Sequence, residues 1–255
     1  VEGSTDVAIL RALAERLEHP VFAIWDERIN TYYVQNNHPS QNDDAELERV
    51  EGGFGVTPRE HFGSLRNLLP ELQGLALLDN DGQNRVDRDE GGLAIRYWQR
   101  YEAENYFITP DLLRSYAHRQ YPTDDLFAEP TSAAIEEALA EVISESVFDG
   151  DVAGYEEWRR LPPAFANMVW ESETRRRKMS AIAEEFFRRL AQKTGHGMLL
   201  TKGELHRLVP FAELSSNAKT EVYAKLDALQ RLFERARPHA EPSAWELNGQ
   251  LDQPL

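Results

Sequence analysis

Short apolar runs alternate with helical patterns over the first 110 residues, and this alternation restricts the folds open to the chain. Residues 5–17 carry apolar side chains at helical spacing, and a capping box with proline at the first helical position predicts another helix over 57–69. Continuous apolar runs at 21–25, 74–78 and 93–98 are typical of buried strands. Strands alternating with helices predict an α/β fold with a parallel sheet.

The pattern becomes almost wholly helical after residue 109, which predicts a large α-helical annex. A segment rich in glycine, 195–203, is expected to return the chain to the sheet. Helices are predicted over residues 110–121, 132–147, 165–193 and 216–235. The expected division of the chain is a core at 1–122, a helical insertion at 123–194, a return segment and final helix at 195–237, and a polar tail at 238–255.

Composition excludes several classes of protein. The chain of 255 residues has no cysteine, which rules out disulfides and thiolate zinc sites. No apolar stretch approaches the roughly 20 residues needed to cross a bilayer, so we expect a cytoplasmic protein without a membrane partner. The chain opens with Val1, Glu2 and Gly3 instead of an initiator methionine, which suggests a fragment of a longer polypeptide.

Acidic residues fall where the predicted elements meet. Glu2 and Asp6 flank a glycine at the predicted junction between a strand end, residues 1–3, and the first helix. Asp79 and Asp81 follow a predicted strand, and their side chains point the same way if the chain is still extended. Each pair also has an ordinary interpretation, since acids complement helix dipoles and Asp-Asn-Asp-Gly is common in turns.

A third acidic pair, Glu102 and Glu104, follows the run at 93–98, where Asn105 and Tyr106 offer hydrogen bonds. Parallel sheets place ligand sites at the carboxyl ends of their strands, so all three pairs are expected at one edge. Converging carboxylates repel one another unless cations lie between them, and hard oxygen ligands suit Mg²⁺ or Mn²⁺. Two such ions support phosphoryl transfer.

A calcium loop is a competing interpretation of residues 79–90. Oxygen-bearing side chains stand at positions 1, 3, 5 and 9 of an EF-hand pattern, and Glu90 stands at position 12. Against this, Asn84 replaces the glycine of position 6, and the preceding run favours a strand.

Three motifs resemble the Toprim region of the overcoming-lysogenisation-defect (OLD) family of nucleases. They are Val-Glu-Gly-x-x-Asp at 1–6, Leu-Leu-Asp-x-Asp-Gly at 77–82 and Arg-x-Glu-x-Glu-Asn-Tyr at 100–106. The likeness covers residues 1 to about 115 and returns at Leu-Thr-Lys-Gly, 200–203. The chain departs from the family's Glu-Ile-Glu-Asn by carrying Ala103.

The resemblance implies a Toprim, Rossmann-like fold and a DNA endonuclease that uses two divalent metal ions, Mg²⁺ or Mn²⁺, in phage defence. It also implies an N-terminal ABC-type ATPase domain in the same polypeptide. The implied metal ligands are Glu2, Asp6, Asp79, Asp81, Glu104 and, with less support, Glu102; Glu2 would help to activate the water, and Lys202 would stabilise charge on the phosphate. A calcium-binding regulatory module and a topoisomerase- or primase-type Toprim domain remain the alternatives.

A charge of −16 is unusual for a protein that binds DNA, because phosphate contacts come from clustered Lys and Arg. The basic run Arg175, Arg176, Arg177 and Lys178 is the candidate DNA-binding group, with Arg159 and Arg160 as an alternative, although such a run is more often a solvated helix face, because its side chains point around the helix. The helical annex has two interpretations, a dimer interface or helices that fill their own core.

Overall fold

The computed structural model describes residues 1–28, 31–32, 57–121 and 128–235. It is mostly helical with one small sheet, and so is α/β in the broad sense. Its α-helices are α1 (Ser4–Arg16), α2 (Val21–Arg28), α3 (Pro58–Leu68), α4 (Pro110–Gln120), α5 (Ala128–Ser146), α6 (Val152–Arg159), α7 (Pro163–Thr174), α8 (Met179–Thr194) and α9 (Ser216–Arg235). Its strands are β1 (Gly74–Leu78), β2 (Arg88–Glu90) and β3 (Leu93–Tyr97), and its 3₁₀ helices are η1 (Ala103–Tyr106) and η2 (Lys202–Phe211).

The sheet has the strand order β1-β3-β2. β1 and β3 are parallel, with Gly74 opposite Leu93 and Leu78 opposite Tyr97. The predicted runs at 74–78 and 93–98 therefore form the parallel pair. The expectation of a wholly parallel sheet was wrong, because β2 runs antiparallel to β3. β2 has the sequence Arg-Asp-Glu, which is polar and carries no strand signal.

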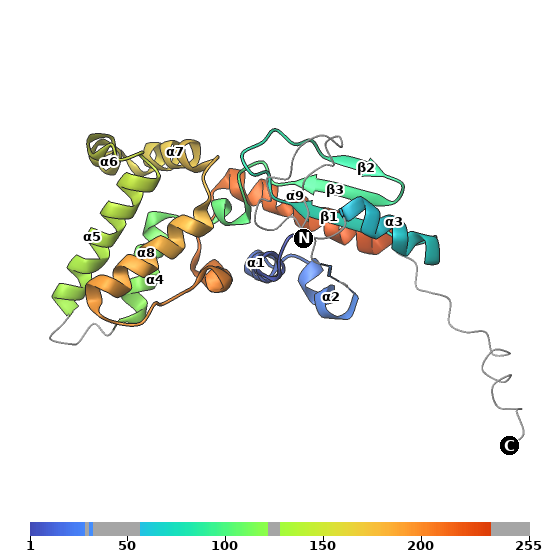
Figure 1. Ribbon diagram of the computed structural model, residues 1–255, viewed down its shortest axis with the longest axis horizontal. Coiled ribbons are helices and arrows are strands. Elements are labelled where there is room, and N and C mark those ends of the chain that lie inside the picture. Colours follow the sequence, from blue (N-terminus) through green and yellow to red (C-terminus); the bar gives the residue numbers. More distant parts are fainter. Residues whose placement is uncertain (29–30, 33–56, 122–127, 236–255) are drawn as a thin grey trace, which may run out of the picture.

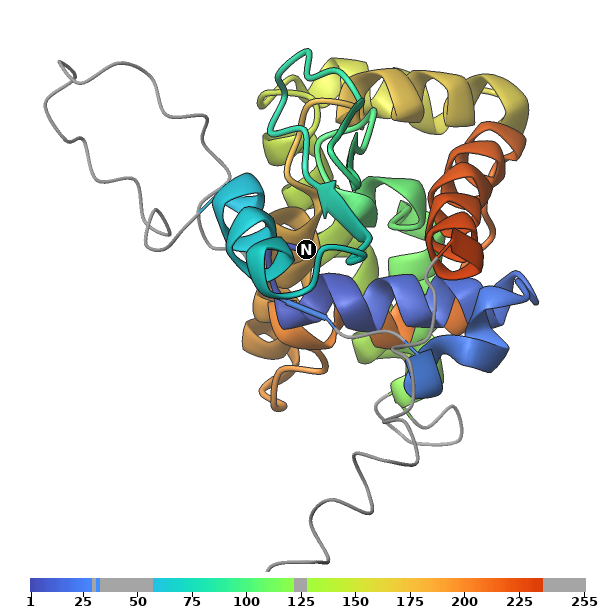
Figure 2. The same ribbon diagram turned by 90° about the vertical axis from the view of Figure 1, so that its right-hand side faces the viewer.

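Successive residues of β1 face opposite sides of the sheet, as strand geometry requires. Ala76 and Leu78 join Phe62 of α3 in a small core. Leu77 faces the other way and belongs to the main core, on the side of α9. Figure 2 shows α3 and α9 on either side of the strands. Thr57 begins α3 with the predicted capping box, in which its hydroxyl accepts from the amide of Glu60.

The larger core lies among the helices and extends to α1. α5 packs along α8, and α1 packs on η2, so Leu13 of α1 shares a core with Leu139 and Phe187 of the annex. Figure 1 shows α4 to α8 at one end of the long axis and the sheet, with α3 and α9, at the other. None of the helices in the described ranges is long and apolar enough to cross a membrane.

The strand predicted at residues 21–25 was wrong, because these residues begin α2. The ring nitrogen Nδ1 of His19 accepts a hydrogen bond from the amide of Val21 at 3.2 Å and so caps the helix. Val21 and Trp25, four residues apart, are buried, while Ala23 between them is exposed. A run of five apolar residues fits a buried strand and a helix equally well, and here burial follows the helical period.

The single long helix predicted over 165–193 was also wrong, because the structure divides it into α7 and α8. Residues 175–178 form the turn between them. The carbonyl of Arg175 accepts from the amide of Tyr101 at 2.9 Å, and the carbonyl of Thr174 accepts from the side chain of Asn105 at 2.7 Å. In a continuous helix these two carbonyls would accept from the amides of residues 178 and 179. Here they accept from Tyr101 and Asn105 instead. The sequence pattern also missed α6.

Three further expectations have a structural outcome. Residues 1–3 and 195–203 contain no strand in the described structure, so the predicted return to the sheet was wrong. Residues 79–87 join β1 to β2 and residues 88–90 form β2, whereas a calcium loop joins two helices. The carboxylate of Glu90 instead pairs with Arg59. The predicted tail at 238–255 lies outside the described residues.

Candidate functional site

The N-terminus of α1 holds the first acidic pair. Oδ2 of Asp6 accepts hydrogen bonds from the amides of Glu2 at 3.0 Å and Gly3 at 2.8 Å. Asp6 therefore caps α1, which agrees with its ordinary interpretation as a helix-terminus acid. Burial raises the pKa of Asp6, while these hydrogen bonds and the nearby Lys202 oppose that rise. One carboxylate thus belongs both to the helix end and to a wider charged group.

The second acidic pair meets the first through Asp79. Its amide donates to Oε1 of Glu2 at 3.0 Å, which joins the end of β1 to the start of α1. Burial, followed by the charges of Glu2, Asp6, Glu102 and Glu104, raises the pKa of Asp79 well above its usual range. Asp79 therefore stands where the three acidic pairs meet. The pKa of Glu2 is also raised, by burial first and then by Asp81 and Asp6.

Asp81 does not lie on an extended chain, contrary to the sequence expectation. Its φ is +49°, and Gly82 follows at +69°, so the chain turns sharply after β1. The carbonyl of Tyr101 holds this turn by accepting from the amides of Asn80 and Asp81 at 3.0 and 3.2 Å. Oδ2 of Asp81 lies 3.4 Å from Nη2 of Arg85. Asp81 still reaches the group, because its charge acts on Glu2.

The third pair, at η1, is buried instead of solvated. Glu102 is 3% exposed, and its two oxygens accept from the amide and the hydroxyl of Ser180, at the start of α8. Oδ1 of Asn105 accepts from the amide of Glu102 at 3.1 Å, so Asn105 braces this acid as expected. The hydroxyl of Tyr106 accepts from the amides of Gln99 and Arg100 instead. Glu102 is thus committed to the N-terminus of α8.

Glu104 has the most perturbed surroundings of the third pair. It is 5% exposed, and burial, followed by the charge of Glu102, raises its pKa to about 8. Lys202 opposes this rise. A carboxyl group with this pKa is largely protonated at neutral pH unless a cation comes near it. The neighbouring Ala103 stands where the OLD pattern has isoleucine. Its smaller side chain is still buried.

Two lysines lie beside the carboxylates. Lys202 begins η2, and its charge lowers the pKa values of Asp6, Glu102 and Glu104. Lys178 stands immediately before α8; burial lowers its pKa, but Glu102, Tyr101 and Asp79 raise it by more. The sequence predicted Lys178 only as part of a DNA-binding run on a long helix. Its closeness to the acids was missed, because it depends on the break between α7 and α8.

The carboxylates are close without forming a ready-made ion cage. In the described ranges, no three His, Cys, Asp or Glu side chains already stand where they could hold one metal ion. The donor set nevertheless suits a hard divalent cation, because all six acids offer oxygen, burial raises the pKa values of five of them, and repulsion by other acids adds to the rise for Glu2, Asp79 and Glu104. A cation would relieve that repulsion.

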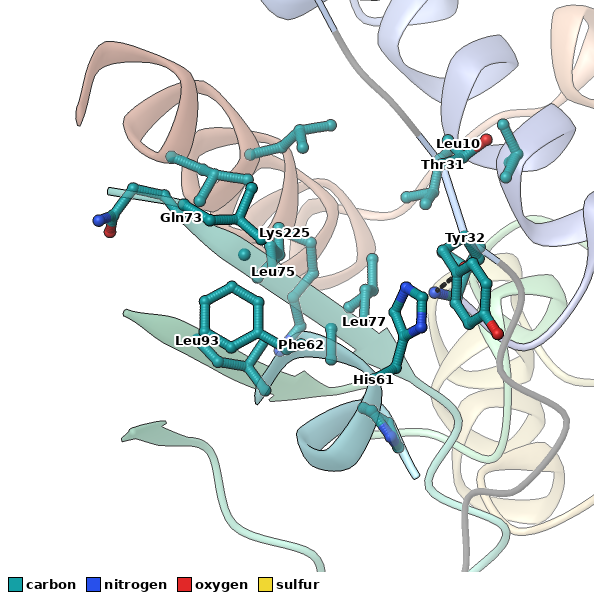
Figure 3. Close-up of a pocket in the computed structure, with 18 of the residues that line it drawn as sticks. Leu10, Thr31, Tyr32, His61, Phe62, Gln73, Leu75, Leu77, Leu93 and Lys225 are labelled. Carbon is teal, nitrogen blue, oxygen red and sulfur yellow. Dashed lines mark hydrogen bonds between the residues drawn. The ribbon is translucent and has the colours of Figure 1, made fainter. Parts of the chain in front are cut away.

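The cavity shown in Figure 3 is a different place. It has a volume of about 450 Å³ and lies between α3, α9 and β1. Phe62, Leu75 and Leu77 give it apolar walls, and the rings of Tyr32 and His61 stack at 3.4 Å at one side. No aspartate or glutamate of the described chain lines it. The acidic group is therefore outside this cavity.

Comparison with known proteins identifies no relative. No family model, curated protein or solved structure matches the chain. The functional argument therefore depends on the residues and on their geometry.

Proposed function

We propose that this chain is a Toprim-type catalytic region of a DNA endonuclease that depends on Mg²⁺ or Mn²⁺. One observation carries the proposal. Six carboxylates at the start of α1, after β1 and at η1 act on one another's charge, although the first and the last, Glu2 and Glu104, are 102 positions apart, and Lys202 acts on three of them. Burying so many like charges is costly unless cations neutralise them.

Four acids are the best candidates to hold metal ions: Glu2, Asp6, Asp79 and Glu104. Glu102 is a weaker candidate, because Ser180 already uses both of its oxygens. Asp81 would have to share its carboxylate with Arg85. Bound divalent ions would supply an activated water and stabilise the leaving oxygen in phosphodiester hydrolysis.

The protein's own residues would perform the remaining tasks. Glu2 is placed to accept the proton of an attacking water, because burial and nearby acids raise its pKa and make it a better base. Lys202 would stabilise negative charge on the phosphate, since it is the exposed cation beside Asp6 and Glu104. In the OLD pattern an ATPase domain of the same polypeptide would regulate this cleavage.

A calcium-binding regulatory module has less support. Its loop would need Glu90 as the last ligand, but Glu90 lies in β2 and pairs with Arg59. Asp79, its first ligand, faces the other acids across the end of β1.

Plasmid cleavage tests the proposal. Supercoiled DNA is incubated with the chain and Mg²⁺, Mn²⁺, Ca²⁺ or EDTA, and the variants Asp79→Ala and Glu2→Ala are compared with Glu157→Ala, an exposed acid on α6. We expect nicked or linear DNA with Mg²⁺ or Mn²⁺ from the native chain and from Glu157→Ala only. Cleavage that persists in EDTA, or in both site variants, would overturn the proposal, as would folded chain without cleavage under any metal.

A further inference from the structure

Tyr101 attaches the turn between α7 and α8 to the loop of the second acidic pair. The amide of Tyr101 donates to the carbonyl of Arg175 at 2.9 Å, and its carbonyl accepts from the amides of Asn80 and Asp81. Only Tyr101 therefore separates the turn, residues 175–178, from the loop that carries Asp81. This places a run of four basic residues at the border of the six carboxylates.

Asn105 and Glu102 also bind the turn and the residue that follows it. The side-chain amide of Asn105 donates to the carbonyls of Thr174 at 2.7 Å and Arg177 at 3.1 Å, and Glu102 accepts from Ser180 just beyond the turn. Backbone groups on both sides of the turn are thus bound to η1. Because η1 also carries Glu104, these bonds hold the backbone of the turn beside the site.

The four basic side chains divide into two kinds. Arg177 is turned inward: it donates to both carboxylate oxygens of Asp149 and to the carbonyl of Ser146. Arg175, Arg176 and Lys178 are exposed. Within the described part of the chain, no carboxylate lies within ion-pair distance of any of these three. The side chains of Arg175 and Arg176 remain available for anions in solution, and that of Lys178 lies against Lys202 and close to Glu102.

The negative charge of the chain makes a local cluster of cations important for binding a polyanion. The chain carries a formal charge of −16, and the site itself is rich in carboxylates. A polyanion approaches such a protein only where cations are clustered locally, because charges beyond about 8–10 Å are screened at ordinary salt. The exposed residues of the turn, with Lys202 beside Lys178, supply a cluster of this kind.

We propose that Arg175, Arg176 and Lys178, together with Lys202, form a cationic rim that holds the phosphate backbone of DNA beside the carboxylates. The inference rests on the proposed nuclease function and gives it a substrate-binding surface. Arg177 takes no part in the rim and instead anchors the turn to the end of α5. The alternative of a solvated helix face does not apply, because these residues form the turn between α7 and α8.

Salt-dependent DNA binding tests the rim. Anisotropy of a labelled duplex is measured in Ca²⁺ over a range of salt for the native chain, for Arg175→Ala/Arg176→Ala/Lys178→Ala, and for a control of equal charge, Arg159→Ala/Arg160→Ala/Lys219→Ala. The control residues are exposed on α6, just after it, and on α9. The slope of log affinity against log salt should fall by about 0.9 for each lost phosphate contact, or about 2–3 in the rim variant, and stay unchanged in the control.

Each result distinguishes the rim from the nuclease. Equal slopes in rim and control variants, or no binding by the native chain, would overturn the rim. Metal-dependent plasmid cleavage that survives in the rim variant with native affinity would overturn the rim and leave the nuclease intact. A native chain that shows the expected slopes but never cleaves would leave the rim standing and remove the nuclease. Circular dichroism and thermal melting of all variants establish that the comparison concerns folded protein.

Discussion

The amide of Asp79 donates to Oε1 of Glu2 at 3.0 Å, across 77 positions of the sequence. This bond makes Glu2 both a charged member of the acidic group and an acceptor that positions the end of β1. The two properties can be separated by substitution, because glutamine keeps an oxygen acceptor and loses the charge.

We expect Glu2→Gln to stay as stable as the native chain, because it retains an acceptor for the amide of Asp79. Glu2→Ala should lose about 0.5–1.5 kcal/mol of unfolding free energy with that hydrogen bond. Both variants should lose metal-dependent cleavage, while Glu15→Gln, an exposed acid on the same helix, should keep it. Urea denaturation and plasmid cleavage give the two measurements. Full cleavage by Glu2→Gln would show that the charge is not required.

Stability without metal should fall as pH rises, because burial raises the pKa of Glu104 from an ordinary 4.5 to about 8. The folded state then holds its proton more tightly than the unfolded state. The stabilisation is complete below about pH 4.5 and is lost as pH rises through about 8. Glu2, Asp6 and Asp79 have pKa shifts in the same direction and add to the effect.

Urea denaturation in EDTA at about pH 5 and pH 8.5 measures this loss, which we expect to be about 1–4 kcal/mol for Glu104. Glu104→Gln should reduce the difference between the two pH values and should be the more stable protein at the higher one. Glu157→Gln, on the surface of α6, provides the control. Parallel pH profiles for native and Glu104→Gln chains would contradict the expected protonation of Glu104.

Glu102 should matter more for α8 than for metal binding, because Ser180 occupies both of its oxygens. Glu102→Ala should cost about 2 kcal/mol of unfolding free energy, as the loss of a buried, charged cap does. Ser180→Ala should cost less, because its amide still has Glu102 as acceptor. In a double-mutant cycle the two losses should add to more than the loss in the double variant. Additive losses would mean that the two residues act independently.

Local patterns explain which parts of the fold could be predicted. The apolar run of β1 is followed at once by Asp79 and a turn, and Thr57 with Glu60 marks the start of α3; both signals lie within a few residues. Residues 21–25 gave an ambiguous signal, because five consecutive apolar residues carry no period, and the cap from His19 that starts α2 cannot be read as a pattern.

The rest depends on contacts between distant residues. The break between α7 and α8 arises from hydrogen bonds to Tyr101 and Asn105, about 70 positions earlier, and nothing in the basic run itself ends a helix. The sequence suggested that the acidic pairs would gather, from their places at element ends. It could not indicate that Glu102 would be taken up by Ser180, because that bond exists only once α8 starts beside η1.

Asn105 is the residue that couples the acidic group to the basic turn. Its side chain accepts from the amide of Glu102 and donates to the carbonyls of Thr174 and Arg177, and it is 3% exposed. Asn105→Ala should therefore cost about 2–4 kcal/mol, because it removes the acceptor of the Glu102 amide, the donor of the Arg177 carbonyl and one of the two donors of the Thr174 carbonyl. Asn105→Asp should lower the unfolding free energy further than Asn105→Ala does. It keeps the acceptor, but it loses both donors and adds a buried charge close to Glu102.

The position of the turn gives the more specific result. If Asn105 holds it, hydrogen exchange in Asn105→Ala should accelerate at residues 175–180 beyond the acceleration in α5, and the salt slope of DNA binding should fall while all four basic residues remain. Thr109→Ala, which removes the cap of the neighbouring helix α4, serves as a control that destabilises the fold without a contact to the turn. Faster exchange spread evenly over the helices in both variants would mean that Asn105 stabilises the fold in general and does not position the basic residues.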